Sequence, residues 1–198
     1  MRSLIIRPIQ AGFTLVELLI VVIIIAILAA IVVPQFSSST RDAQEAALDA
    51  NLSAMRSAIE LYRVQHNSVY PGANASSGGP TCTTGGTLGG GGGGSATAFA
   101  DQLLMFSTAG GATCTVGDTT NYRFGPYIRK GIPLDSSPTP IATVTPQTGG
   151  APLVTGTGPT ATCSSCTTAG GWNYNFTTGQ IVMNNTNNDS RGNPFFTH

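Results

Sequence analysis

The sequence predicts an α+β protein in which one long N-terminal helix packs on a small antiparallel sheet with long Gly/Thr-rich loops. Three observations support this: a long apolar segment over 13–33 with a single charge, an apolar stripe with helical spacing after it, and alternating aromatic residues around a Thr-Gly turn near the C-terminus. Of the 198 residues, 41% are hydrophobic and only 9% charged, against roughly a quarter charged in ordinary soluble domains. One part of the chain therefore avoids water.

Residues 1–12 have the features of an export and processing signal. Arg2 and Arg7 precede the apolar segment and no acidic residue does, which favours an N-terminus left in the cytoplasm. An ordinary signal peptide has its small-residue cleavage site after the apolar stretch, whereas Ala11-Gly12 comes before it. Cleavage after Gly12 would leave the apolar helix on the mature protein.

The apolar segment Phe13–Val33 is long enough to cross a bilayer, which needs about 20 residues. Its single charge is Glu17, and a carboxylate in hydrocarbon needs a partner because burying it costs about 3 kcal/mol. The nearest candidate is the amine that cleavage would create on Phe13, in the same chain or in a neighbouring copy. Two alternatives remain. The segment is a simple membrane anchor, or Glu17 lies near enough to the helix end to extend its carboxylate to the membrane–water interface.

The run from Gly12 through Glu17 to Ile31 resembles the prepilin signature of type IV pilins and type II secretion pseudopilins. The resemblance implies a type IV pilin-like fold, cleavage between Gly12 and Phe13 by a prepilin peptidase, and N-methylation of Phe13. It also implies that Glu17 sets subunit register during assembly and that Pro34 is the helix-kinking proline of the family. It covers roughly residues 7–66.

The segment 34–66 is expected to continue the helix with an amphipathic pattern. Its apolar residues recur three or four positions apart and define one face, which we expect to pack against the C-terminal domain: Leu48, Leu52, Met55, Ile59 and Tyr62. Arg41–Glu45 and Arg56–Glu60 are opposite charges four residues apart. A helix from about Phe13 to His66 would be ~80 Å long at ~1.5 Å per residue, far more than one membrane span needs.

Residues 67–198 are expected to form a globular β-sheet domain. The Gly-rich stretch ending in Gly89–Gly94 has no helix or strand pattern and no phosphate-loop context, which indicates a flexible surface loop. Residues 96–108 suit a short helix or turn. Trp172 to Met183 is typical of a hairpin that turns at Thr178-Gly179.

Two further stretches, 125–128 and 132–135, resemble the sheet region of the type II secretion major pseudopilin. That family continues into a Pro-Trp-Gly segment and a calcium loop, whereas here Asp135 leads into Ser136-Ser137-Pro138. We expect no cofactor. Asp189, which lies among several asparagines, has enough oxygen atoms around it for a weak Ca²⁺ site, although solvated turn residues are the favoured interpretation.

The four cysteines all lie in the polar part of the chain, as expected of an exported domain with two disulfides. Three pairings are possible, and we favour Cys82 with Cys114 and Cys163 with Cys166. Neither a redox nor a zinc role is favoured, because Cys163 and Cys166 have no strand-to-helix context and no histidine ligand pattern around them. No metal site is expected.

The sequence favours a structural subunit over an enzyme or a nucleic-acid-binding protein. His66 and His198 belong to no nucleophile–base arrangement, and the basic residues are too scattered to form a field for nucleic acid. We expect a homo-oligomeric helical filament, assembled by an inner-membrane platform and displayed on the cell surface or in the periplasm, that serves adhesion, motility or DNA uptake. The alternatives are a type II secretion pseudopilin and a monomeric membrane-anchored binding domain.

Overall fold

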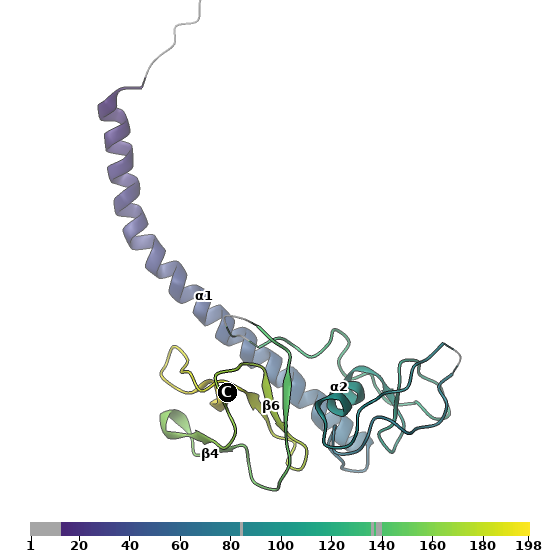
Figure 1. Cartoon of the computed structure of the whole chain (residues 1–198). Helices are drawn as coiled ribbons and strands as arrows, with labels where there is room; N and C mark the ends of the chain where they lie inside the picture. Colours follow the sequence, from purple (N-terminus) through teal and green to yellow (C-terminus); the bar gives the residue numbers. More distant parts are fainter. Residues whose placement is uncertain (1–12, 84, 136, 138–139) are drawn as a thin grey trace, which may run out of the picture. The chain divides into compact units, whose positions relative to one another are not determined.

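The computed structural model describes residues 13–83, 85–135, 137 and 140–198, without the side chains of 34, 37 and 38. The contacts divide the chain after Asp42 into two units, and each is described by itself. The helix α1, Leu15–Gln65, contributes to both (Figure 1). It continues past Pro34 without interruption.

The second unit begins at Ala43 and is built on the C-terminal half of α1. The predicted apolar stripe is confirmed, because Leu48, Leu52, Met55, Ile59 and Tyr62 are each at most 1% exposed. The helix ends where Asn67 and Ser68 adopt positive φ angles and the Ser68 N–H donates to the Arg63 carbonyl at 2.9 Å.

The main sheet packs on this stripe and has the strand order β3-β6-β7. The strands β6, Trp172–Asn175, and β7, Ile181–Met183, are antiparallel and form the predicted hairpin. The third strand, β3, Val144–Gln147, pairs parallel to β6. The α+β class is confirmed, with a sheet that is mixed instead of purely antiparallel.

The core lies between α1, α2 and one face of this sheet. The predicted short helix is present as α2, Ala96–Leu104, with Ser95 as its N-cap. Phe99 and Leu103 of α2 and Trp172 and Tyr174 of β6 are 0% exposed and belong to the same cluster as the α1 stripe. Figure 1 shows α2 beside the last turns of α1.

The opposite face of the sheet is also covered, by the chain between 149 and 167. Successive residues of a strand point to opposite faces, so Asn173 and Asn175 lie on this second face, and both are buried. Asn175 donates to the carbonyls of Gly149 and Ala151, and Asn173 donates to that of Ser165. The long insertion is therefore held to the sheet by asparagine side chains.

Two short two-stranded sheets and two 3₁₀ turns complete the domain. The strand β1, Phe106–Ser107, pairs with β2, Thr113–Cys114, and β4, Val154–Thr155, pairs with β5, Thr162–Cys163. The 3₁₀ turns are Gly158–Thr160 and Phe195–Thr197. Both favoured disulfides are present, Cys82–Cys114 and Cys163–Cys166.

The Gly-rich stretch lacks regular elements, as expected, but it is not a free loop. The N–H of Gly89 donates to the Thr113 carbonyl, and the Gly91 carbonyl accepts from the Ser76 N–H at 2.9 Å. A Cβ on Gly91 would lie 2.2 Å from the Ala98 backbone nitrogen. Glycine is needed here because the backbones of two segments touch, so the stretch is a loop that packs against the domain.

Candidate assembly site

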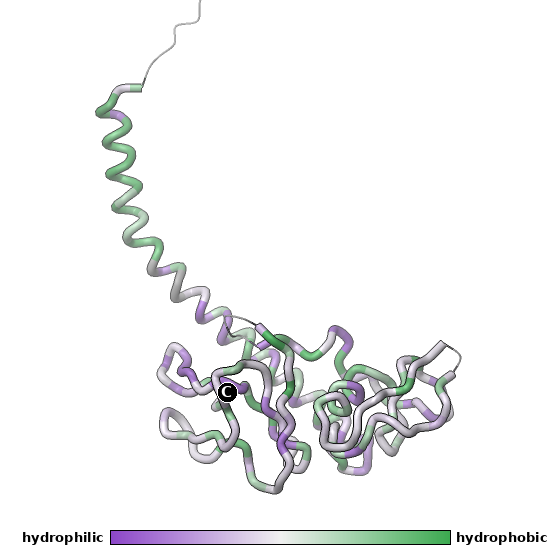
Figure 2. Tube along the Cα trace, viewed as in Figure 1, coloured by the Kyte–Doolittle hydropathy of each residue, from purple (hydrophilic) through white to green (hydrophobic). Residues whose placement is uncertain are grey.

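The described part of the first unit, residues 13–42, exposes an apolar helix surface. Between Leu15 and Val33 the large apolar side chains are 41–82% exposed, and Figure 2 shows this run as hydrophobic over most of its length. It is long and apolar enough to cross a membrane, and none of it is buried. A helix that is apolar on all sides is stable only in lipid or among other apolar surfaces.

The start of α1 is organised by Thr14 and Glu17. The Thr14 hydroxyl oxygen accepts a hydrogen bond from the Glu17 N–H at 3.2 Å, so Thr14 acts as the N-cap. The carboxylate of Glu17 then lies in the first turn, where the helix dipole favours a negative charge.

Of the residues expected to serve cleavage and assembly, the structure describes Phe13, Glu17 and Pro34. Phe13 precedes the helix and is 79% exposed. The helix α1 begins at Leu15, two residues later than expected. Gly12, and with it the expected cleavage bond, lies outside the described residues. Pro34 lies within α1. A free Phe13 amine would stand just before a helix N-terminus that carries Glu17.

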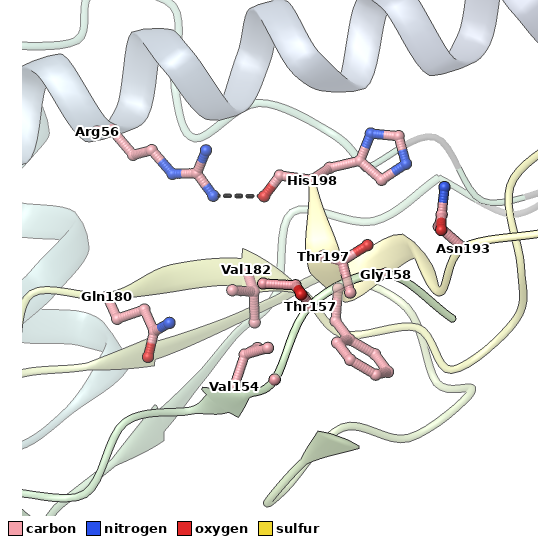
Figure 3. A pocket seen from close by; sticks show the side chains of 11 residues that line it. Arg56, Val154, Thr157, Gly158, Gln180, Val182, Asn193, Thr197 and His198 are labelled. Carbon is pink, nitrogen blue, oxygen red and sulfur yellow. Dashed lines mark hydrogen bonds between the residues drawn. The ribbon is translucent and has the colours of Figure 1, made fainter. Parts of the chain in front are cut away.

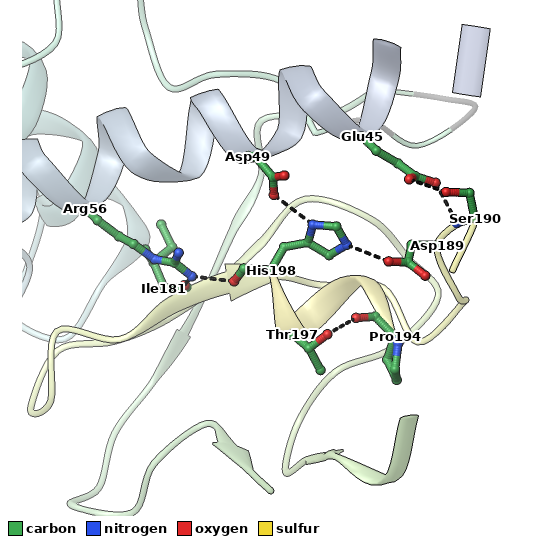
Figure 4. Close-up of polar contacts among 9 residues, drawn as sticks. All are labelled: Glu45, Asp49, Arg56, Ile181, Asp189, Ser190, Pro194, Thr197 and His198. Atoms are coloured by element: carbon green, nitrogen blue, oxygen red, sulfur yellow. Dashed lines mark hydrogen bonds and ion pairs between the residues drawn. The ribbon is translucent and has the colours of Figure 1, made fainter. Parts of the chain in front are cut away.

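A clamp of polar contacts attaches the C-terminal segment 189–198 to α1 within the second unit (Figure 4). Glu45 accepts hydrogen bonds from the Ser190 N–H and hydroxyl, both at 2.7 Å. Asp49 lies 2.7 Å from Nδ1 of His198. Arg56 donates to the carbonyls of His198 and Ile181 at 2.6 and 3.3 Å. We call this set the C-terminal clamp.

The clamp corrects one expectation. Arg56 was expected to pair with Glu60, but its guanidinium turns toward the C-terminal segment, and Glu60 instead pairs with Arg63 at 3.2 Å. Burial lowers the pKa of Arg56, and the nearby Asp49 carboxylate partly offsets this. Sequence spacing alone could not find the clamp, since its partners are more than 120 residues apart.

A cavity of about 340 Å³ lies beside the clamp (Figure 3). Its walls include Arg56, Val154, Gln180 and Phe196. His198, which also lines the cavity, has Nδ1 2.7 Å from Asp49 and Nε2 3.4 Å from Asp189.

Asp189 organises a turn. Its Oδ1 accepts hydrogen bonds from the Arg191 and Asn193 N–H groups, at 2.9 and 2.7 Å. Burial alone would raise the pKa of Asp189, but these N–H donors and His198 hold it below its usual range. Among the described residues no group of three or more His, Cys, Asp or Glu side chains is placed to bind a metal ion.

His66 is a buried structural residue at the end of the stripe. Its ring stacks on Tyr62 with centroids 3.7 Å apart. Nδ1 lies 2.8 Å from the Tyr62 carbonyl oxygen and Nε2 3.0 Å from the Ser107 hydroxyl. A carbonyl can only accept, so Nδ1 carries the proton and Nε2 accepts from Ser107. Burial lowers the pKa of His66, although backbone contacts with Tyr62 and Thr108 oppose the shift.

Known proteins match this chain at its N-terminal helix and over about half of its length. Residues 7–33 match the family described as "Prokaryotic N-terminal methylation motif". The type IV narrow pilus major component PilA5 of Thermus thermophilus is 37% identical over 114 residues, which cover 56% of this chain and 97% of that protein. No solved structure matches the chain.

Proposed function

Because the chain belongs to the type IV pilin family, we propose that it is the repeating structural subunit of a pilus, working without a cofactor. The observation that carries this proposal is the apolar helix Leu15–Val33, none of which is buried, with its single carboxylate. In the membrane this helix anchors the precursor. In the filament, the same helices of many copies cover one another.

Maturation begins in the inner membrane. A prepilin peptidase cuts between Gly12 and Phe13 and removes the leader 1–12, and the new Phe13 amine is methylated. The match of residues 7–33 to the methylation motif supports both steps. An assembly platform then moves the subunit from the membrane into the growing fibre.

Glu17 guides assembly by pairing with the Phe13 amine of a neighbouring copy. An unpaired carboxylate among apolar helices is costly, by about 3 kcal/mol on membrane-insertion scales. Pairing removes that cost only in the correct register. Pro34, further along the same helix, permits local adjustment between its two halves, because proline lacks the N–H that would bond one turn back.

A surface pilus is favoured over a type II secretion pseudopilus, because the relative with 37% identity is a pilus component. The fibre would serve adhesion, twitching motility or DNA uptake. A strain lacking the protein separates these tasks: surface attachment, colony spreading and transformation frequency each report on one. Intact fibres with lost exoprotein secretion would favour the pseudopilus.

The N-terminus of the native protein tests the proposal. Removal of twelve residues leaves 186 (198 − 12), with methyl-Phe13 first, and intact-mass and peptide spectrometry would detect this. Met1 retained in cells would falsify the pilus role and favour a monomeric anchored protein.

Glu17→Ala tests assembly separately from insertion. We expect the variant to enter the membrane but form few or no fibres in electron micrographs. Asp42→Ala is the matched control, since it removes an exposed acid from the same helix outside the apolar segment. Normal fibres from Glu17→Ala would refute the register role.

A further inference from the structure

A second stripe runs along α1 in the domain and faces away from the core. Leu61 and Val64 are 51% and 77% exposed. They follow smaller exposed residues at the same three- and four-residue spacing: Ala47, Ala50, Ala54 and Ser57. At 3.6 residues per turn, this stripe is offset from the buried one by roughly 140°. We call Leu61 and Val64 the exposed pair.

An apolar groove of about 340 Å³ lies elsewhere on the same domain. One wall is the outer side of α2, with Ala96 and Ala100, and the other includes Ile132 and Val144. Val144 begins β3, which pairs with β6 and is an edge strand among the described elements. No residue of α1 lines the groove.

The two surfaces differ, which decides the kind of assembly that they can make. A surface that pairs with its own copy gives a closed dimer, whereas a projection that enters a different surface of the next copy gives a ring if the rotation closes and an open helical array if it does not. Leu61 and Val64 protrude from α1, whereas the groove is concave. Their union is therefore of the type that a filament requires.

The charges beside the two surfaces are complementary. Arg129 and Lys130 are exposed and lie within three residues of Ile132, so their backbones are within about 10 Å of that groove residue. Glu60 precedes Leu61, and its side chain is 53% exposed. Its Oε2 already pairs with Arg63 at 3.2 Å, but a carboxylate has two oxygen atoms and can accept a further cationic partner. A second copy seated in the groove would bring an acidic residue toward two basic ones. Surface pairs of this kind contribute mainly orientation.

We propose that the exposed pair Leu61 and Val64 of one copy inserts into the α2–β3 groove of the next, with Glu60 facing Arg129 and Lys130. The inference rests on the proposed filament role and assigns a contact between neighbouring domains. It is separate from the packing of the Leu15–Val33 helices.

Cross-linking in assembled fibres tests the contact. One chain would carry Leu61→Cys and a second, co-expressed chain Ala100→Cys, and a short bis-maleimide reagent would be added without reductant. We expect a covalent product containing both chains. The control replaces Leu61→Cys by Leu88→Cys, a leucine that is 40% exposed on another part of the domain, and should give little product.

Charge reversal provides an independent readout. Glu60→Lys and Lys130→Glu should each reduce fibre number, and a chain carrying both should recover part of it, because the reversed charges meet again across the contact while the Glu60–Arg63 pair within the chain stays lost. A double variant no better than the single ones would overturn the pairing.

The outcomes separate the contact from the filament role. Fibres without the Leu61–Ala100 product, or with equal product from the control pair, would overturn the contact and leave the pilus subunit intact. Dimers formed by Leu61→Cys chains alone would show that the exposed stripe of one copy pairs with the same stripe of another. This outcome would also overturn the proposed contact. Absence of both fibres and Phe13 maturation in the wild type would overturn the two proposals together.

Discussion

The guanidinium of Arg56 donates a 2.6 Å hydrogen bond to the carbonyl oxygen of His198, joining α1 to a residue 142 positions later in the chain. Glu45 and Asp49 hold the same segment from the preceding turns of α1. The clamp thus fixes the C-terminal segment to the helix that supports the whole domain.

Replacing Arg56 by methionine should destabilise the domain by about 1–2 kcal/mol, because two carbonyls lose a charged donor. Denaturant unfolding of the full chain in detergent, followed by the fluorescence of buried Trp172, measures the change. Arg191→Met is the matched control: its side chain is exposed, so a change within about 0.5 kcal/mol is expected. Equal losses in both variants would argue against the clamp.

Stability should fall as pH drops from 7 to 5 because of His66. In the unfolded chain histidine has a pKa of about 6.5, and burial lowers it in the fold. Below about pH 6.5 the unfolded chain therefore binds more protons, and stability is lost as pH falls toward the folded pKa. Melting temperatures across this range would show a flatter profile for His66→Gln, whereas an unchanged slope would contradict the assignment.

Two neighbouring glycines should respond oppositely to alanine. Gly91→Ala places a Cβ against the Ala98 backbone and should cost about 1–3 kcal/mol, as overpacking does. Gly92 has nothing within 4 Å of an added Cβ, so Gly92→Ala should be neutral or stabilise by up to about 1 kcal/mol. Equal melting temperatures for the two variants would mean that the glycine run is not packed.

The two disulfides should contribute unequally. Cys82–Cys114 spans 32 residues and Cys163–Cys166 spans 3. Loop-closure entropy then predicts about 4 kcal/mol for the first and about 2 for the second. Paired Cys→Ser variants compared by chemical denaturation would test this, and a larger loss from the short bridge would reject the entropic explanation.

Calcium and chelator should leave the melting temperature within about 1 °C, because Asp189 already accepts two backbone hydrogen bonds and faces His198. Asp189→Asn should lower stability with or without calcium, since an amide oxygen accepts the two N–H bonds more weakly than a carboxylate and the charge that faces His198 is lost. A rise in melting temperature on adding millimolar Ca²⁺ that Asp189→Asn abolishes would instead identify a metal loop.

The sequence predicted those elements whose signals are local. The stripe from Leu48 to Tyr62 and the hairpin at Thr178-Gly179 depend on spacing within a few residues, and both are present. The strand β3 was missed because it is short and contains Pro146, which has no N–H for a sheet ladder. Its parallel pairing with β6 is fixed by tertiary packing.

The C-terminal clamp and the ordered glycine run were missed for a related reason. Arg56 offers a plausible partner four residues away, yet its carbonyl partners come from the far end of the chain. A run of glycines suggests a loop with a free backbone conformation, yet the absence of a side chain is what lets Gly91 approach the backbone of α2. At the candidate assembly site, spacing located Glu17 and the apolar helix, while the Thr14 cap emerged only from the structure.

The Cys82–Cys114 bridge also determines what a protease outside the cell can achieve. The segment 83–113 contains no lysine or arginine, so trypsin-like enzymes find no site there. An enzyme that cuts after Leu88, which is 40% exposed, would leave two pieces joined through sulfur. Such a nicked subunit would migrate as one band on a non-reducing gel and as two after reduction, and a fibre could keep its continuity after its surface had been cut.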